Sequence, residues 1–128
     1  MNRAFRTRTF TRWMHKSGLT DAVLCQAVTE MSQGLIDADL GGYVVKKRVA
    51  LPGQGKRGGA RTIVATKLLD RWFFLYGFGK NDRANIDKDE LKMLQEIAKD
   101  FLAFDDAQLA TALTAGEIVE ICNDNYPT

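Results

Sequence analysis

The sequence predicts an α+β domain in which a small antiparallel β-sheet of three to four strands carries helices on one face. Three β-rich segments follow one another between residues 43 and 79, one helical pattern precedes them, and further helical patterns follow them. Short connections join antiparallel neighbours, because a parallel return needs a longer crossover. The 128 residues suit a single domain that buries a core without a metal or a disulfide framework.

The first 34 residues predict an extended segment followed by a helix. Residues 3–16 partly alternate Arg or Thr with apolar side chains, which favours a short edge strand, the fourth of the sheet, or an arm on the surface. Thr20 is a suitable N-cap for the helix, and Gly34 is a suitable stop. The apolar residues of this helix recur at spacings of three and four: Val23, Leu24, Ala27, Val28 and Met31.

The three central strands are expected over residues 43–51, 61–68 and 71–79. On a period of two, Lys47 shares a face with apolar neighbours, while Lys46 and Arg48 form a basic row on the other face. The same period divides the third strand into two sets. One set is Trp72, Phe74, Tyr76, Phe78 and Lys80, and the opposite set is Phe73 and Leu75.

The last third of the chain is expected to be helical. Asp87 and Glu90 have the spacing of a capping box, with Asp at the cap position, ahead of an apolar stripe. A second helix is expected from Asp106, and residues 114–117 resemble another capping box that opens a final helical turn.

Charge divides unevenly along the chain. Residues 1–61 hold eleven Lys and Arg against four Asp and Glu, whereas residues 62–128 hold seven against twelve. The two halves therefore carry +7 and −5. A basic surface built by the first half favours a nucleic-acid partner. The alternative is that the two halves interleave in space and neutralise each other.

Several classes of protein are disfavoured by what the sequence lacks. No apolar run approaches the roughly 18 residues that span a bilayer, and we expect neither a secretory signal nor a membrane anchor. Cys25 and Cys122 are too few for a disulfide scaffold, so we expect reduced, structural cysteines in a cytoplasmic protein. The lone His15 excludes a two-histidine ribonuclease pair, and no zinc or calcium motif is present.

The segment from Gly53 to Gly58 matches the Gly-x-Gly-x-x-Gly pattern of dinucleotide-binding proteins. That motif binds a pyrophosphate at the N-terminus of a following helix, whereas this segment leads into a strand. We therefore interpret it as a basic hairpin loop, in which Lys56 and Arg57 approach a phosphate backbone, and we expect no nucleotide cofactor.

The order of elements, with VVKKRVALPGQGKRGGARTIVA followed by WFFLYGFGKNDRANI, resembles the RelE/ParE superfamily of toxins. The most similar group is the HigB-like RelE branch of bacterial type II toxin–antitoxin modules. The resemblance covers residues 17–104 and leaves 105–128 as a helical extension of the same domain. It implies a compact RelE-like fold and an endonuclease that cuts mRNA in the ribosomal A site. It also implies neutralisation by a helix-turn-helix antitoxin.

The implied reaction is attack of a 2′-OH on the adjacent phosphorus, which leaves a cyclic phosphate and a free 5′-OH without a metal. By resemblance, Arg61 is the phosphate-binding arginine, and Lys46, Lys47 and Arg48 are the basic strand residues. Lys80 lies in the Gly-Lys step that ends the last strand. The RNA-binding residues expected from the basic row and loop are Lys46, Arg48, Lys56 and Arg57.

Two positions depart from the family pattern. Asn81 follows the Gly-Lys step where well-known members have a catalytic arginine, and Ile86 stands near the position of their catalytic tyrosine. Our hypothesis is that Lys80 or Arg83 stabilises the transition state, and that Tyr76 or a lysine of the 46–47 pair moves a proton.

Two other functions stay open at this point. The ParE branch of the superfamily poisons DNA gyrase without cutting RNA, and the two departures are compatible with that activity. The other alternative is a non-catalytic relative that binds nucleic acid.

Overall fold

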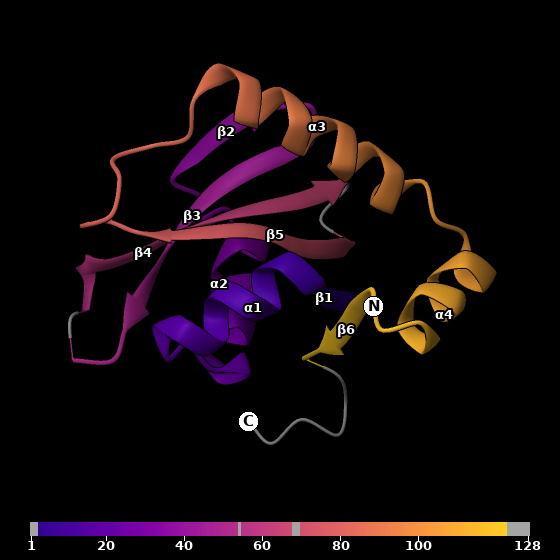
Figure 1. The fold of residues 1–128 in the computed structure, drawn as a ribbon, viewed down its shortest axis with the longest axis horizontal. Coiled ribbons are helices and arrows are strands. Elements are labelled where there is room, and N and C mark those ends of the chain that lie inside the picture. Colours follow the sequence, from indigo (N-terminus) through magenta and orange to yellow (C-terminus); the bar gives the residue numbers. More distant parts are fainter. Residues whose placement is uncertain (1–2, 54, 68–69, 123–128) are drawn as a thin grey trace.

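The structure, a computed structural model, describes residues 3–53, 55–67 and 70–122 without the side chains of residues 55–58. Ten elements form a six-stranded sheet with four helices (Figure 1). The strands are β1 Arg3–Thr7, β2 Ala38–Gly41, β3 Val44–Leu51, β4 Gly55–Lys67, β5 Arg71–Gly79 and β6 Ile118–Ile121. The helices are α1 Arg8–Ser17, α2 Asp21–Ser32, α3 Lys88–Leu102 and α4 Asp106–Thr114.

The sheet is larger than predicted and is mixed rather than antiparallel. Its strand order is β2-β3-β4-β5-β1-β6, and the central meander β3-β4-β5 is antiparallel as expected. β1, however, pairs in parallel with β5, from Arg3 beside Arg71 to Arg6 beside Phe74. The predicted edge strand therefore lies inside the sheet, because β6 pairs with its other side.

The N-terminal segment contains a strand and a helix, where the sequence suggested one extended arm. β1 ends at Thr7, whose side chain accepts a hydrogen bond from the Phe10 backbone N–H and so caps α1. Phe10 and Met14 then lie one turn apart and are both buried. In residues 8–17 the apolar side chains recur at the helical spacing of three and four, and this segment is helical. The alternation of Arg and Thr with apolar residues before it is the pattern of strand β1.

The predicted helical turn near the C-terminus is wrong. Ile118–Ile121 is strand β6, which pairs antiparallel with β1 from Thr7 beside Ile118 to Ala4 beside Ile121. The second capping box instead lies at Asp105 and Gln108, where it starts α4. The β-branched run of residues 118–121 is stabilised as a strand because β1 offers it an unpaired edge.

Helices cover both faces of the sheet, whereas the sequence predicted one covered face. Figure 1 shows α3 on one side of the sheet, with α1 and α2 on the other. The α1/α2 side encloses one hydrophobic core, whose largest members include Phe10, Leu24, Met31, Trp72 and Phe74. The α3/α4 side encloses another, which includes Phe5, Phe73, Leu94, Ala98 and Leu109. Apolar runs such as Trp72–Leu75 are typical of strands buried on both faces.

A β-bulge in β5 changes the faces that were predicted for its second half. Ile63 pairs with Tyr76, but the next residue of β4, Val64, pairs with Phe74, so Leu75 is the extra residue. Tyr76 and Phe78 consequently join Phe73 and Leu75 in the core on the α3 face. Strict alternation would have placed these two aromatics with Trp72, on the other face.

Cys25 and Cys122 form a disulfide with their Cα atoms 5.4 Å apart, contrary to the expectation of reduced thiols. The bond joins α2 to the residue that follows β6 and spans 97 residues of sequence. Sequence could not reveal this contact, because it depends on β6 pairing at the sheet edge next to β1. Within the described ranges, no helix has both the length and the hydropathy needed to cross a bilayer.

Gly77 lies where α1 crosses β5. A Cβ atom built on this residue would lie 2.3 Å from Cζ3 of Trp13, far inside van der Waals contact. Trp13 in turn contacts the Phe10 ring edge-on, with centroids 5.4 Å apart. The absence of a side chain at residue 77 is therefore what allows α1 to pack on this strand.

Replacing Gly77 with alanine is expected to lower the free energy of unfolding by about 2 kcal/mol, because the new methyl group overpacks against Trp13. Urea denaturation measures the change. The cost should shrink when Gly77→Ala is introduced into a Trp13→Ala background, which removes the ring. Equal costs in both backgrounds would contradict this account of the contact.

Removing the disulfide by a Cys25→Ser substitution is expected to lower the free energy of unfolding by about 3 kcal/mol, because the unfolded chain gains conformational freedom. Thermal unfolding with and without a reductant checks this value, and the reductant should leave the variant unaffected. Rapid alkylation of both thiols in the native, untreated protein would show that the bond is absent.

Candidate active site

Strand register brings the predicted basic and aromatic residues together on the α3 face of the sheet. Side chains of residues paired across adjacent strands share a face. Two rows cross β3, β4 and β5 in this way. The first row is Lys46, Ile63 and Tyr76, and the second is Arg48, Arg61 and Phe78. We call the charged and aromatic residues of these two rows, together with Arg83, the basic–aromatic cluster: Lys46, Arg48, Arg61, Tyr76, Phe78 and Arg83.

Arg61 is the central cation of the cluster. It lies on β4 between Arg48 and Phe78, and its side chain is half-buried. Its Nη1 atom is buried and has no hydrogen-bond partner among the residues that the structure describes. A buried donor without a hydrogen bond lowers the stability of the fold by about 1–3 kcal/mol, and buried donors in folded proteins are rarely without one. An anionic oxygen from a ligand would satisfy this nitrogen.

Arg83 reaches the cluster from the turn that follows β5. That turn is closed by hydrogen bonds from the Asp82 and Arg83 backbone N–H groups to the Gly79 carbonyl oxygen. The Arg83 guanidinium lies over the Phe78 ring, 5.7 Å from its centroid, and Nη1 donates to the Tyr76 hydroxyl at 3.4 Å. Arg83 and Tyr76, two of the predicted catalytic residues, are therefore in direct contact.

Glu90 holds Arg83 in this position and was not predicted as a site residue. Both of its carboxylate oxygens accept hydrogen bonds from the Arg83 guanidinium, with Oε2 at 2.8 Å from Nη1. Oε1 also accepts from the Asp87 backbone N–H at 3.0 Å, as the capping box at the start of α3 requires. The only sequence signal for Glu90 was that capping box, which predicts the helix start and says nothing of Arg83.

The ion pair shifts the pKa of both partners. The hydrogen bond from Arg83 is the main cause that lowers the pKa of Glu90 to about 2, and the Asp87 backbone N–H adds to it. The hydrogen bond to Glu90 likewise raises the pKa of Arg83 above its ordinary value. Both groups are thus charged throughout the physiological pH range.

Lys47 lies away from the cluster. Its neighbours across the sheet are Thr62 and then Gly77, on the α1/α2 face. The side chain is 6% exposed, and its Nζ atom lies 2.9 Å from Glu30 Oε1 and 2.9 Å from the Leu35 carbonyl oxygen. Its predicted orientation toward apolar neighbours is confirmed by this burial. Lys46 is consequently the member of the 46–47 pair that the register brings to the cluster.

The other predicted residues lie at the margin of the cluster or outside the described part of the chain. The exposed Lys80 follows β5, with its backbone N–H bonded to the Gly59 carbonyl oxygen at 3.1 Å. Arg48 pairs with Asp37 at 3.1 Å. The side chains of Lys56 and Arg57 are outside the described residues. Ile86, at the position of the family's tyrosine, packs against the core of the α3 face.

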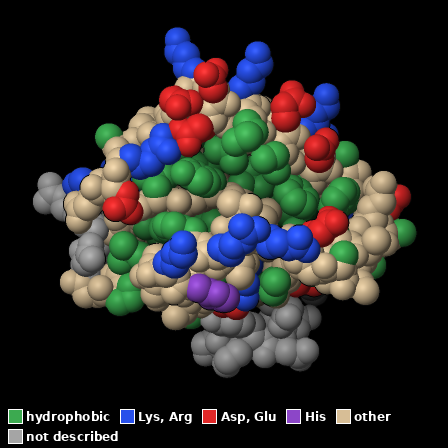
Figure 2. Space-filling model, in the orientation of Figure 1, with side chains coloured by type: hydrophobic (Ala, Val, Ile, Leu, Met, Phe, Trp, Pro, Cys, Tyr) green, Lys and Arg blue, Asp and Glu red, His purple; other side chains and the backbone are tan. Residues whose placement is uncertain are grey.

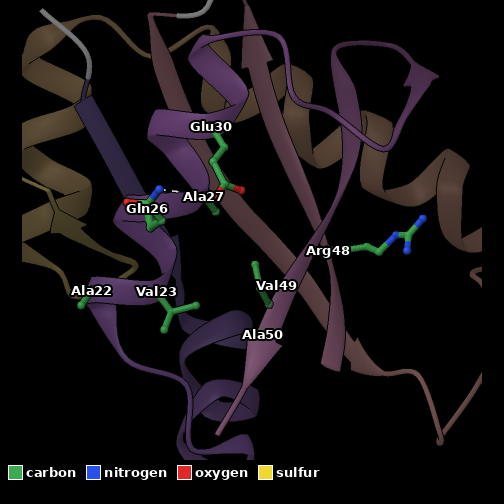
Figure 3. A pocket seen from close by; sticks show the side chains of 8 residues that line it. All are labelled: Ala22, Val23, Gln26, Ala27, Glu30, Arg48, Val49 and Ala50. Atoms are coloured by element: carbon green, nitrogen blue, oxygen red, sulfur yellow. Dashed lines mark hydrogen bonds between the residues drawn. The ribbon is translucent and has the colours of Figure 1, made fainter. Parts of the chain in front are cut away.

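A second concave site lies on the opposite side of β3 from the cluster. This pocket of about 280 Å³ is formed by α2 and the part of β3 that extends beyond its pairing with β2. Figure 3 shows its lining from Val23 and Ala27 to Val49, with the Arg48 side chain directed away from α2. Gln26, Glu30 and Arg48 are its polar lining residues, so it shares Arg48 with the cluster, whereas Arg61, Tyr76 and Arg83 do not line it.

The cluster combines three properties: a buried cationic donor that the described residues leave without a partner, a second guanidinium, and a phenol. Together they suit an anionic ligand whose charge increases during a reaction. Among the residues that the structure describes, no three His, Cys, Asp or Glu side chains lie close enough together to hold a metal ion.

Comparison with family models matches residues 2–121 to the RelE toxin of the RelE/RelB toxin–antitoxin system. The matched range is longer than the predicted 17–104 and includes β1, α4 and β6. Comparison with curated proteins gives no match.

Replacing Arg83 with alanine is expected to return the pKa of Glu90 from about 2 toward its ordinary value of 4.5. The pair stabilises the fold fully above pH 4.5, and this stabilisation is lost as the pH falls toward 2, because the lowered pKa belongs to the folded state. NMR titration of the Glu90 carboxyl carbon measures both values.

Lys92→Ala is the matched control for this titration, since Lys92 is an exposed cation on the same helix. It should leave the Glu90 midpoint unchanged. A midpoint near 4.5 in the unaltered protein would show that Arg83 and Glu90 are not paired in solution.

Proposed function

The chain belongs to the RelE toxin family, and from this premise we propose that it is a ribosome-dependent mRNA endonuclease of the HigB-like branch. It acts in the bacterial cytoplasm, cuts mRNA in the ribosomal A site without a metal, and is neutralised by a helix-turn-helix antitoxin. The observation that supports this proposal best is the buried Nη1 of Arg61, which has no partner among the described residues and lies on β4, across the strand pair from Phe78 on the face that carries Tyr76 and Arg83.

The proposed reaction is an internal transfer at phosphorus. The 2′-hydroxyl gives its proton to water, the 2′-oxygen forms a bond to the adjacent phosphorus as the bond from phosphorus to the 5′-oxygen breaks, and negative charge accumulates on the non-bridging oxygens. Arg61 binds the scissile phosphate through its half-buried guanidinium, and Arg83 stabilises the added charge. Donors aimed at such charge are each worth about 10²–10³ in rate.

Tyr76 is the residue to which we assign proton transfer. Its hydroxyl oxygen already accepts a hydrogen bond from Arg83, so its own proton is free to be donated to another oxygen. The departing 5′-oxygen needs such a proton. In this assignment Arg83 stabilises charge and Tyr76 donates the proton. These are the roles that the family's arginine and tyrosine would have at positions 81 and 86, where this chain has Asn81 and Ile86.

The remaining cations of this face bind the RNA on either side of the cleaved bond. Lys46 and Arg48 extend the cluster across β3, and Lys80 extends it beyond the end of β5. Lys56 and Arg57 lie at the start of β4, and we keep them as RNA-binding residues. These contacts are to phosphates, so they contribute affinity without codon preference.

Arg61→Ala, Arg83→Ala and Tyr76→Phe are each expected to reduce mRNA cleavage on ribosomes by about 100-fold or more, because each removes one charge-stabilising or proton-donating group. Mapping of new RNA 5′ ends on purified translating ribosomes measures the effect. Lys92→Ala, an exposed lysine of α3, should cleave at the normal rate.

Three results would contradict the proposal in different ways. Full growth inhibition by all three site variants would show that the residue assignment is wrong. Absence of new RNA ends together with a DNA-damage response would favour the gyrase-poison alternative. A chain that does not inhibit growth at all would favour the non-catalytic relative.

A further inference from the structure

Cys25 and Cys122 fasten the outer strand of the sheet to a helix. β6 is last in the strand order, and its four residues pair with β1 (Figure 1). Cys122 directly follows β6, and its bond to Cys25 ties the end of this strand to α2. Short segments at the edge of a structure open more easily than its core. The bond therefore acts on a strand whose pairing can open locally while the rest of the sheet stays folded.

Cys122 holds a backbone conformation that its side chain disfavours. Its φ angle is 60°, in the left-handed region that residues with a Cβ atom rarely adopt. Such a conformation persists only where the surrounding structure imposes it. The bond to Cys25 supplies this restraint, so cleavage of the bond lets the end of β6 return to an ordinary conformation and leave its place.

Both cysteines are accessible to a thiol reductant. They pack against the core of the α1/α2 face and keep part of their surface in contact with solvent. Glutathione and thioredoxin keep thiols reduced in the cytoplasm, and the disulfides that occur there are mostly catalytic or redox-sensing. A partly exposed disulfide in a protein that acts in this compartment is therefore suited to reversible exchange.

The first residue of β6 is connected to the candidate active site through Thr7. Ile118 pairs with Thr7 at the end of β1. The Thr7 hydroxyl donates a hydrogen bond at 3.4 Å to the carbonyl oxygen of Leu75, the extra residue of the bulge in β5. Tyr76 follows Leu75 directly. Release of β6 removes the strand that pairs with Thr7 and so loosens the hydrogen bond that fixes the bulge.

The end of β1, the bulge and the phenol are also neighbours in space. Thr7, Leu75 and Tyr76 line one open cavity of about 590 Å³ between α1 and α3. Figure 2 shows hydrophobic side chains gathered across this side of the molecule, bordered by a row of Lys and Arg side chains. A shift at the end of β1 therefore reaches Tyr76 through direct contacts.

We propose that Cys25 and Cys122 form a site of reversible thiol–disulfide exchange, and that their bond controls the toxin by holding β6 against β1. The oxidised protein keeps Tyr76 in position and is the active form. The reduced protein releases β6 and cleaves less mRNA. The effect on cleavage rests on the proposed function, whereas the release of β6 does not.

The exchange uses a reductant of the thiol class, such as glutathione or a dithiol protein. A thiolate of the reductant bonds to one cysteine sulfur as the bond between Cys25 and Cys122 breaks, and the released sulfur takes a proton. A second reductant thiolate then bonds to the first reductant sulfur, and the other cysteine sulfur leaves and takes a proton. Two electrons and two protons pass to the protein, and the reductant becomes a disulfide.

The test places the full-length protein in buffers with graded ratios of reduced to oxidised glutathione. Alkylation followed by mass spectrometry measures the reduced fraction. Hydrogen exchange across residues 118–121 should quicken at least about tenfold in the reduced form, while the central strands stay protected, because only this edge opens. Cleavage of mRNA on ribosomes should fall at least about threefold as the bond is reduced, and should recover on reoxidation.

The double variant Cys25→Ser, Cys122→Ser is the matched control. Its β6 should exchange rapidly, and its cleavage rate should equal that of the reduced protein, at every glutathione ratio. A reduced fraction that stays constant across the ratios, or reduction that leaves exchange across residues 118–121 unchanged, would overturn the proposal. Reduction that frees β6 without slowing cleavage would overturn the control of activity. Lack of cleavage by the oxidised protein would contradict the proposed function itself, and the exchange measurement would still decide whether the bond holds β6.

Discussion

The single extra residue in β5 determines where the chemistry of this protein lies. Because Leu75 has no partner in β4, the chain after it is turned so that Tyr76 and Phe78 lie on the α3 face and Gly77 lies under Trp13. Bulges of this kind reorient side chains locally without disturbing the rest of a sheet. Without it, the phenol would face α1, and Arg83 would have neither the Tyr76 hydroxyl nor the Phe78 ring to contact.

Ion pairs in the folded protein neutralise part of the uneven charge along the sequence. Arg3 pairs with Glu120 and Arg6 with Asp21, so part of the positive first half is neutralised, in one case by the acidic second half. Lys47 and Arg48 also have acidic partners. Arg61 differs because one buried nitrogen of its guanidinium has no partner within the described part of the chain. The location of unpaired charge, more than its sum, indicates where an anion binds.

Local signals in the sequence predicted the elements well. Thr20 and Asp87 cap their helices as expected, and β3 and β5 lie close to their predicted ranges, because caps and periodicity depend on neighbouring residues. The second central strand was predicted over residues 61–68, but β4 begins at Gly55, so the expected basic loop at Lys56 and Arg57 is wrong and these residues belong to the strand. The bulge at Leu75, the pairing of β6 with β1 and the Cys25–Cys122 bond depend on contacts between distant segments. The sequence indicated Arg61 and Tyr76 as site residues. It could not show that Lys46 rather than Lys47 lies on the face of the cluster, or that Glu90 binds Arg83, because both depend on the same kind of distant contact.

Helix α3 connects the hydrophobic core to the basic–aromatic cluster. Its first turn places Glu90, which fixes the Arg83 guanidinium. Leu94 and Ala98 anchor the same helix in the core of the α3 face. The contact between Arg83 and Tyr76 therefore depends on the packing of this helix against the sheet, because Glu90 can hold the guanidinium only where the helix start is fixed.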